Sequence, residues 1–208
     1  MAVNKKEIRE FRGVKNLVIA EILEDSAEKF ETGTPEYLAG AAKVSKTTES
    51  NRETHYYDNV AALAISTEGG DTYTLEISAL DLKTLALITG REYDATNDCI
   101  VGSEPTPKFF ALGYETQDTS GKARYKWAYK GLFSFPDEEY STKTDSAEAS
   151  GQTLEYINIY TIYNFTYKMG EKEVTKVVKD LVLSDEGSFD TTTFFDTVVT
   201  PDVVFPVA

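Results

Sequence analysis

The sequence predicts a mostly β domain with one short helix, and three observations carry this prediction. Apolar and polar residues alternate in several segments, most clearly in residues 72–77, where Tyr73, Leu75 and Ile77 share one face. Residues 153–166 are rich in isoleucine and tyrosine, which favour strands. Only residues 80–89 change to helical spacing. With 208 residues and a hydrophobic content of 41%, the chain is expected to form one domain with a packed core.

The first strand is expected at residues 14–23, because apolar side chains occupy both of its alternating faces. Such a strand is covered on both sides and lies in the middle of a sheet. Residues 29–35 contain Gly33 and Pro35 and are expected to form a loop. The two apolar faces of the strand are Val18, Ala20 and Ile22 on one side and Leu17, Ile19 and Leu23 on the other.

A long hairpin is expected next. Residues 37–48 and 53–67 are extended candidates, and the polar residues 49–52 between them are the expected tip. Gly69, Gly70 and Asp71 indicate a turn before the alternating strand at residues 72–77.

The helix has recognisable start and stop signals. Ser78 is a suitable N-cap, and Asp81 lies in the expected first turn, where the helix dipole favours an anion. Leu82, Leu85 and Ile88 repeat at helical spacing, and Gly90 is placed to end the helix. We therefore expect one short helix near residues 79–89, lying on a face of the sheet.

Strands return after the helix. They are expected at residues 108–114, 123–132, 153–166, 174–183 and 193–205, with a polar loop or connector at residues 136–151. In residues 123–132 the aromatic residues Tyr125, Trp127 and Tyr129 alternate with Arg124 and Lys126. One interpretation is a nucleic-acid groove in which bases stack on these aromatic rings. The favoured interpretation is a strand whose aromatic side chains face inward and whose cations face outward. A third interpretation is a subunit interface.

The formal net charge of −14 argues against a surface that grips phosphate backbones. Simple solubility is at least as good an explanation of this charge as a specific electrostatic role. The N-terminus has no apolar run typical of a signal peptide, and no stretch approaches the ~20 apolar residues that span a bilayer. The sequence therefore predicts a protein kept in a cytosol-like compartment.

The chain has few residues of the types that act as catalytic nucleophiles or zinc ligands. The chain has one histidine, His55, and one cysteine, Cys99, which leaves little for a nucleophile with its base or for a zinc site. His55 is expected on an exposed strand and Cys99 as a small buried residue. No intrachain disulfide is possible, and no glycine-rich phosphate loop is present. We predict no enzymatic activity, no cofactor and no metal.

Two acidic segments, residues 94–98 and 137–139, do not follow the spacing of a calcium loop, so solvated acidic loops are the favoured interpretation. A pair of carboxylates far apart in the sequence, as glycosidases use, stays open at this point.

The order of these segments resembles one family. Four features carry the resemblance: Gly13 to Asn16 (GVKN), Tyr57 with Asp58 and Asn59, the helix ending at Gly90, and residues 142–145 (TKTD). In this order and spacing they resemble the major tail protein family of long-tailed bacteriophages with non-contractile tails. The resemblance runs from Gly13 to about residues 194–196 and so covers most of the chain.

The resemblance implies a β-sandwich of the tail-tube type, flanked by one short helix and carrying extended arms. It implies hexameric rings that stack into a tube around a tape-measure protein, with terminator and distal tail proteins at its ends. Viral DNA would pass through the lumen without specific binding, and no membrane would take part. The protein would be made in the host bacterial cytoplasm and reside in the tail of the virion. An acidic lumen would repel phosphates and let the DNA slide.

By the same resemblance, the hairpin around residues 46–57 is expected to reach into the neighbouring ring. The N-terminal arm, residues 1–12, and the loop at residues 136–151 are further candidates for contacts between copies. The candidate inter-subunit residues are Lys46, Thr48, Glu49, Asn51, Arg52, Glu53, Tyr56, Tyr57, Glu138, Glu139 and Lys143.

The expected organisation is one tail-tube domain over residues 1–208, with the sandwich at 13–200 and a C-terminal tail at 201–208. Two other classes stay open from the sequence. An exposed flat row of tyrosine and tryptophan, on a monomer that binds glycans, would favour a β-sandwich module that binds carbohydrate. Another self-assembling β-protein is part of the same alternative. A pocket with two convergent acids would favour an enzyme.

Overall fold

The computed structural model describes residues 8–57, 60–137 and 151–207, and of Arg52, residues 56–57 and residues 60–65 it describes only the backbone. The prediction of a mostly β fold with a short helix is confirmed. The strands are β1 (Phe11–Asp25), β2 (Phe30–Thr32), β3 (Glu36–Tyr37), β4 (Ala41–Tyr57), β5 (Val60–Ile77), β6 (Tyr93–Asp94), β7 (Cys99–Ile100), β8 (Phe110–Asp118), β9 (Ala123–Phe133), β10 (Gln152–Ile159), β11 (Phe165–Met169), β12 (Lys172–Lys176) and β13 (Asp180–Ser184). The helices are α1 (Leu82–Thr89) and α2 (Pro201–Val204).

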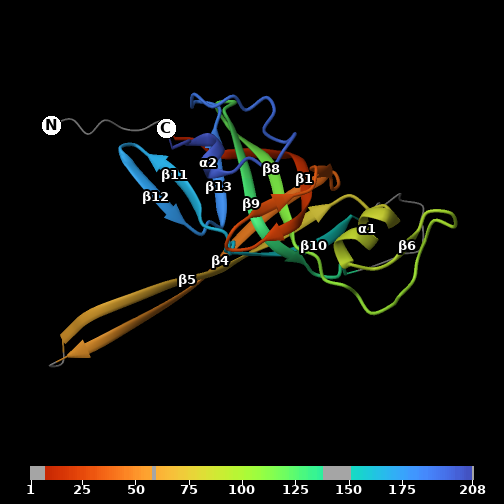
Figure 1. Cartoon of the computed structure of the whole chain (residues 1–208), viewed down its shortest axis with the longest axis horizontal. Coiled ribbons are helices and arrows are strands. Elements are labelled where there is room, and N and C mark those ends of the chain that lie inside the picture. Colours follow the sequence, from red (N-terminus) through yellow and green to blue (C-terminus); the bar gives the residue numbers. More distant parts are fainter. Residues whose placement is uncertain (1–7, 58–59, 138–150, 208) are drawn as a thin grey trace.

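One antiparallel sheet forms the body, with the strand order β1-β8-β9-β10-β5-β4 (Figure 1). β2 and β3 pair with β1. β9 has two partners on its second edge, because residues 124–128 pair with β13 and residues 130–133 pair with β10. The smaller hairpins β6–β7 and β11–β12 lie outside this sheet.

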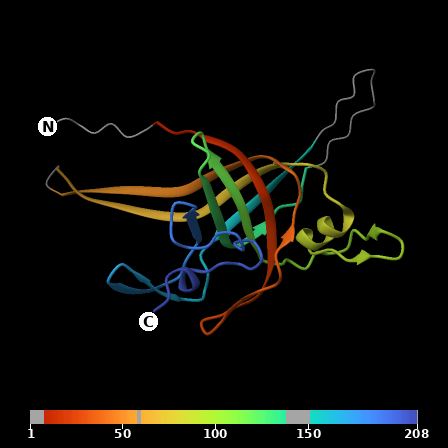
Figure 2. The same ribbon diagram turned by 90° about the horizontal axis from the view of Figure 1, so that it is seen from above.

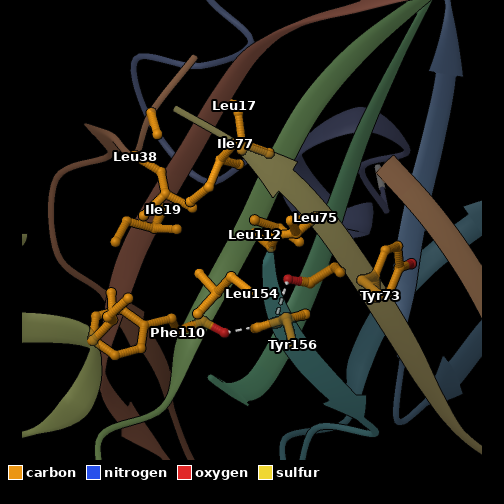
Figure 3. Close-up of a cluster of buried hydrophobic side chains, with 13 residues drawn as sticks. Leu17, Ile19, Leu38, Tyr73, Leu75, Ile77, Phe110, Leu112, Leu154 and Tyr156 are labelled. Carbon is orange, nitrogen blue, oxygen red and sulfur yellow. Dashed lines mark hydrogen bonds between the residues drawn. The ribbon is translucent and has the colours of Figure 1, made fainter. Parts of the chain in front are cut away.

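The main core lies between the two halves of this bent sheet. Leu17 and Ile19 of β1 pack against Leu75 of β5 and Leu154 of β10, and all four side chains are buried (Figure 3). The hydroxyl of Tyr156 donates a hydrogen bond of 2.7 Å to the carbonyl oxygen of Phe110, so the polar end of this large buried ring is satisfied.

A second core covers the other face of β1, β8 and β9. Trp127 and Tyr129 pack there against Phe194 of the C-terminal segment. The Trp127 indole N–H donates to the Phe194 carbonyl oxygen at 3.1 Å, and the Tyr129 hydroxyl donates to that of Val199 at 2.9 Å. β1, β8 and β9 are therefore a middle layer with apolar side chains on both faces, as the sequence predicted for residues 14–23. Leu23 differs from the prediction and is exposed, because the pairing of β1 with β2 shifts register between Ile22 and Glu24.

The GVKN segment lies near the start of β1. Gly13 and Asn16 both adopt positive φ, at 79° and 54°, where the pairing with β8 shifts register. Such bulges bend a strand, and glycine and asparagine tolerate the conformation best. The Asn16 side chain is held by the Glu115 carboxylate at 2.9 Å.

The predicted hairpin tip was wrong. Residues 49–52 lie within β4, where Ser50 pairs with Glu68 and Asn51 with Thr67. Pairing continues to Tyr57 and Val60, so the hairpin is longer on both strands than the polar segment suggested.

The predicted turn at Gly69, Gly70 and Asp71 was also wrong, since all three residues lie in β5. A register shift between Thr48 and Ser50 lies opposite them. A Cβ atom on Gly70 would lie 3.0 Å from the Asn158 carbonyl oxygen, so close backbone approach accounts for this glycine inside a strand.

The helix is confirmed, with a different N-cap. Asp81 caps α1 by accepting a 2.7 Å hydrogen bond from the Thr84 backbone N–H, whereas the Ser78 hydroxyl accepts from the backbone N–H of Gly40. Gly90 ends the helix in the left-handed conformation, as predicted.

Later segments are more divided than the sequence indicated. Residues 153–166 form β10 and the start of β11 with a break between them, and residues 174–183 are shared by β12 and β13. Residues 193–205 form turns and α2, because they cover the second core as a connected surface and pair with no strand of the sheet.

Candidate functional site: the projecting hairpin and its base

The most prominent feature is the outer part of the β4–β5 hairpin, residues 50–57 and 60–68, which we call the arm. The arm projects from the body as a two-stranded ribbon (Figure 1), and no described strand pairs with its outer edges. Eight residues on one strand and nine on the other, at about 3.3 Å each, give a length of roughly 27 Å. A two-stranded ribbon of this kind is marginally stable in water, so we expect another surface to support it.

The composition of the arm is unequal. Residues 60–65 of β5 (VAALAI) form an unbroken apolar run, whereas the opposite strand carries Asn51, Glu53 and His55. The Glu53 side chain is 71% exposed and that of His55 is 40% exposed. An apolar run on a ribbon with free edges is typical of a segment that becomes buried by a partner.

The arm joins the body at a buried carboxylate, Asp71 of β5. Its Oδ2 lies 2.8 Å from the Lys46 Nζ, and its Oδ1 lies 3.0 Å from the Lys179 Nζ. The Thr48 hydroxyl donates a further hydrogen bond of 2.7 Å to Oδ1. Asp71 has no exposed surface, so its hydration is replaced by two hydrogen bonds to Oδ1, from Thr48 and Lys179, and by the ion pair of Oδ2 with Lys46.

A second carboxylate, Asp180 of β13, extends this arrangement. It lies 2.7 Å from the Lys126 Nζ and 3.4 Å from the Lys46 Nζ. Lys179 reaches back to the arm, with 2.5 Å between its Nζ and Glu68 Oε1. The six charged groups balance one another, and we call them the base cluster: Lys46, Glu68, Asp71, Lys126, Lys179 and Asp180.

The pKa shifts follow from burial and these partners. Burial alone would raise the pKa of the Asp71 carboxyl, but hydrogen bonds from Lys46, Thr48 and Lys179 outweigh it and lower the pKa. For Lys126, burial lowers the pKa more than the contact with Asp180 raises it. Burial also raises the pKa of Tyr114, in the same interior, to about 12.

The base cluster fixes the direction in which the arm leaves the body. Its members come from β4, β5, β9, β13 and the residue just before β13, Lys179, so its ion pairs connect both strands of the hairpin to the body. Asp71 and Lys179, the pair at the centre of the cluster, are 0% and 5% exposed, so these two charges have few alternative arrangements. A structural anchor for the arm is the role that this geometry supports.

The structure divides the predicted inter-subunit residues into groups. Lys46 and Thr48 lie at the base and contact Asp71. Glu49, Asn51 and Glu53 are exposed on β4. The backbone of Arg52, Tyr56 and Tyr57 lies in β4 of the arm. Glu138, Glu139 and Lys143 lie outside the described residues. The same is true of Asp58, Asn59 and residues 142–145, which carried part of the family resemblance.

Sequence reasoning missed the base cluster. It placed Asp71 in a turn and Lys126 on an outward face, although the Lys126 residue is only 9% exposed. The partners Lys179 and Asp180 are remote in the sequence, and no local spacing connects them to β5. The one available signal was an aspartate beside two glycines in a β-rich run, which also fits a turn.

Other candidate chemistry gains no support. Trp127 and Tyr129 are buried and Tyr125 is half-buried, so β9 offers no aromatic platform for bases or sugars. Cys99 is half-buried on β7, less covered than predicted, because the short β6–β7 hairpin lies outside the main sheet.

Within the described ranges, no group of three histidine, cysteine or carboxylate side chains is placed to hold a metal ion. In the same part of the chain, no helix has the length and apolar character needed to cross a bilayer. Comparisons with protein-family models and with curated proteins gave no match to this chain.

Proposed function

We propose that this protein is a structural subunit that assembles with copies of itself into stacked rings. The tube so formed would be the tail tube of a long-tailed bacteriophage with a non-contractile tail. The observation that carries the proposal is the arm, a ribbon of roughly 27 Å with an apolar strand and no supporting strand among the described residues.

The body supports this proposal in two ways. Both cores are filled by the chain's own side chains, so the body is expected to fold before it assembles. The base cluster holds the arm at a defined angle, which a repeating assembly requires, because every copy must present the same surface in the same direction.

The order of elements also supports it. GVKN within the first long strand, a long hairpin and a short helix that follows it in the chain occur in the order on which the tail-protein resemblance rests. Hexameric rings, a tape-measure protein in the lumen, terminator and distal tail proteins at the ends, and location in the virion tail all belong to this proposal.

The charge is compatible with conducting DNA. The chain carries 35 acidic against 21 basic side chains, so a lumen lined by it would on average repel phosphates. If charges mapped onto an assembled tube gave a net positive lumen, the repulsion argument would be wrong.

The experiment is an arm deletion followed by negative-stain electron microscopy. Removing residues 51–67 and joining Ser50 to Glu68 through an Asn-Gly turn shortens the hairpin at a paired position and leaves Asp71 in place. The shortened protein should keep its thermal unfolding midpoint and lose the rings or tubes formed by the full chain at high concentration.

A matched pair of point variants separates arm chemistry from general solubility. Ala64→Asp adds one charge to the apolar run, and Val203→Asp adds one on α2, at a side chain that is already 58% exposed. Loss of assembly in Ala64→Asp alone would support the proposal. Tubes from the arm-deleted protein, or a full chain that stays monomeric at high concentration, would overturn it.

A further inference from the structure

A groove lies at the α1 end of the molecule, between that helix and the segment that follows β9. Its volume is about 340 Å³. Phe135 forms one wall and is 50% exposed, which is high for a ring of its size. The lining residues are Leu85, Thr89, Arg91, Phe135, Pro136 and Asp137.

The groove presents a cation on an aromatic ring. The Arg91 guanidinium lies 4.8 Å from the centroid of the Phe135 ring. Arg91 is exposed, and among the described residues no carboxylate forms an ion pair with it. A guanidinium that lies on a phenyl ring offers a flat surface for apolar and tyrosine side chains and donors for their polar groups.

The groove and the arm lie at opposite ends of one strand. β5 begins at Val60 in the arm, ends at Ile77 in the body, and is followed directly by α1 (Figures 1 and 2). Its 18 residues span roughly 60 Å at 3.3 Å each. The arm therefore cannot reach the groove of its own chain, whereas the next copy along the direction of β5 would present its groove to the arm.

We infer that the arm of one copy docks into the α1-end groove of a second copy, and this inference rests on the proposed function. The two surfaces match in chemistry. In the arm, the sequence of β5 contains the apolar run of residues 60–65, and the sequence of β4 ends with Tyr56 and Tyr57. The groove contains Phe135 and Arg91. Tyrosine and arginine are both enriched where protein surfaces meet.

The contact is head-to-tail. Each copy uses its arm on one neighbour and its groove on the other, so the same contact repeats without consuming either surface. Copies joined in this way extend along the direction of β5, which accounts for stacking rather than for the closure of each ring.

A cysteine cross-linking experiment tests this contact in the full chain. In a Cys99→Ser background, Thr54→Cys places a thiol on the arm and Asp137→Cys places one at the exposed rim of the groove. Thr54 pairs with Ala64, and Asp137 bridges Thr153, which pairs with Glu76, so roughly 40 Å of β5 separates the two thiols within one chain. A disulfide between them therefore joins two copies. The expected result is a ladder of trimers and larger species on a non-reducing gel of the assembled protein.

Controls separate this contact from random oxidation. Each single-cysteine variant yields dimers at most, and Thr54→Cys combined with Val203→Cys tests an exposed site on α2 instead of the groove. Phe135→Ala, without any added cysteine, should reduce the assembled fraction at least tenfold at equal concentration.

The outcomes are distinct. A ladder from the arm–groove pair with none from the arm–α2 pair supports the inference. Tubes that form normally, with no arm–groove ladder and no effect of Phe135→Ala, would overturn the docking site and leave the proposed function standing. The absence of both tubes and ladders would overturn the two together.

Discussion

Replacing Asp71 by alanine tests whether the base cluster holds the hairpin to the body. The substitution removes a fully buried carboxylate. It leaves Lys46 with Asp180 alone, and Lys179 with Glu68, whose side chain is 54% exposed. Lys179 is the more affected, since its side chain is only 5% exposed and solvent cannot replace the lost contact.

The expected loss follows from that geometry. Removing one member of a buried ion pair costs about 3–5 kcal/mol of unfolding free energy, because the remaining charge stays desolvated. At about 2–4 °C per kcal/mol for a chain of this size, the midpoint of thermal unfolding should fall by roughly 6–20 °C.

The assay is thermal and urea unfolding followed by circular dichroism, at a low protein concentration that disfavours assembly. The matched control is Lys43→Met, which breaks the 2.8 Å ion pair between the same two strands, Lys43 and Glu76, with side chains 61% and 48% exposed. An exposed pair of this kind contributes at most about 1 kcal/mol. If Asp71→Ala lost no more stability than Lys43→Met, the anchoring role of the cluster would be wrong.

Two further predictions concern pH and backbone conformation. The folded-state pKa of Asp71 is lowered, so the stability that its carboxylate contributes is complete above the ordinary pKa of 3.8 and is lost as the pH falls through the lowered pKa. The free energy of unfolding of Asp71→Ala should therefore fall less steeply with acid than that of the parent. A parallel acid limb in both proteins would show that other carboxyls dominate. Gly90→Ala should lower the free energy of unfolding more than Gly121→Ala. Both glycines have positive φ, but a Cβ on Gly90 would lie 1.9 Å from the Thr106 carbonyl oxygen, whereas nothing lies within 4 Å of a Cβ on Gly121. The conformational cost alone is about 1–2 kcal/mol, and equal losses in the two variants, measured by urea unfolding, would contradict the argument.

Much of the fold could be predicted from local patterns. The alternation in residues 72–77, the double-faced strand at residues 14–23 and the helix that ends at Gly90 are each set by neighbouring side chains, and the structure confirms all three. Burial along a strand or helix repeats with the period of the element, so a sequence window records it directly.

The wrong predictions share one cause: contacts with distant strands override the local composition. Residues 49–52 and Gly69 with Gly70 have the composition of turns, but the hairpin continues past them because its two strands remain paired and Asn158 of β10 approaches Gly70. Lys126 has the composition of an outward position, but Asp180 of β13 lies beside it and allows its burial.

The sequence by itself determined the class of fold, the short helix, the scarcity of catalytic side chains and the acidic charge, because these depend on composition and short-range period. Only the tertiary structure decided how far the hairpin projects, that Asp71 anchors it, and that the groove beside Arg91 lies at the opposite end of β5. Those features depend on which distant strands pair and in what register, and that choice is made by the free energy of the whole packed sheet rather than by any segment of the chain.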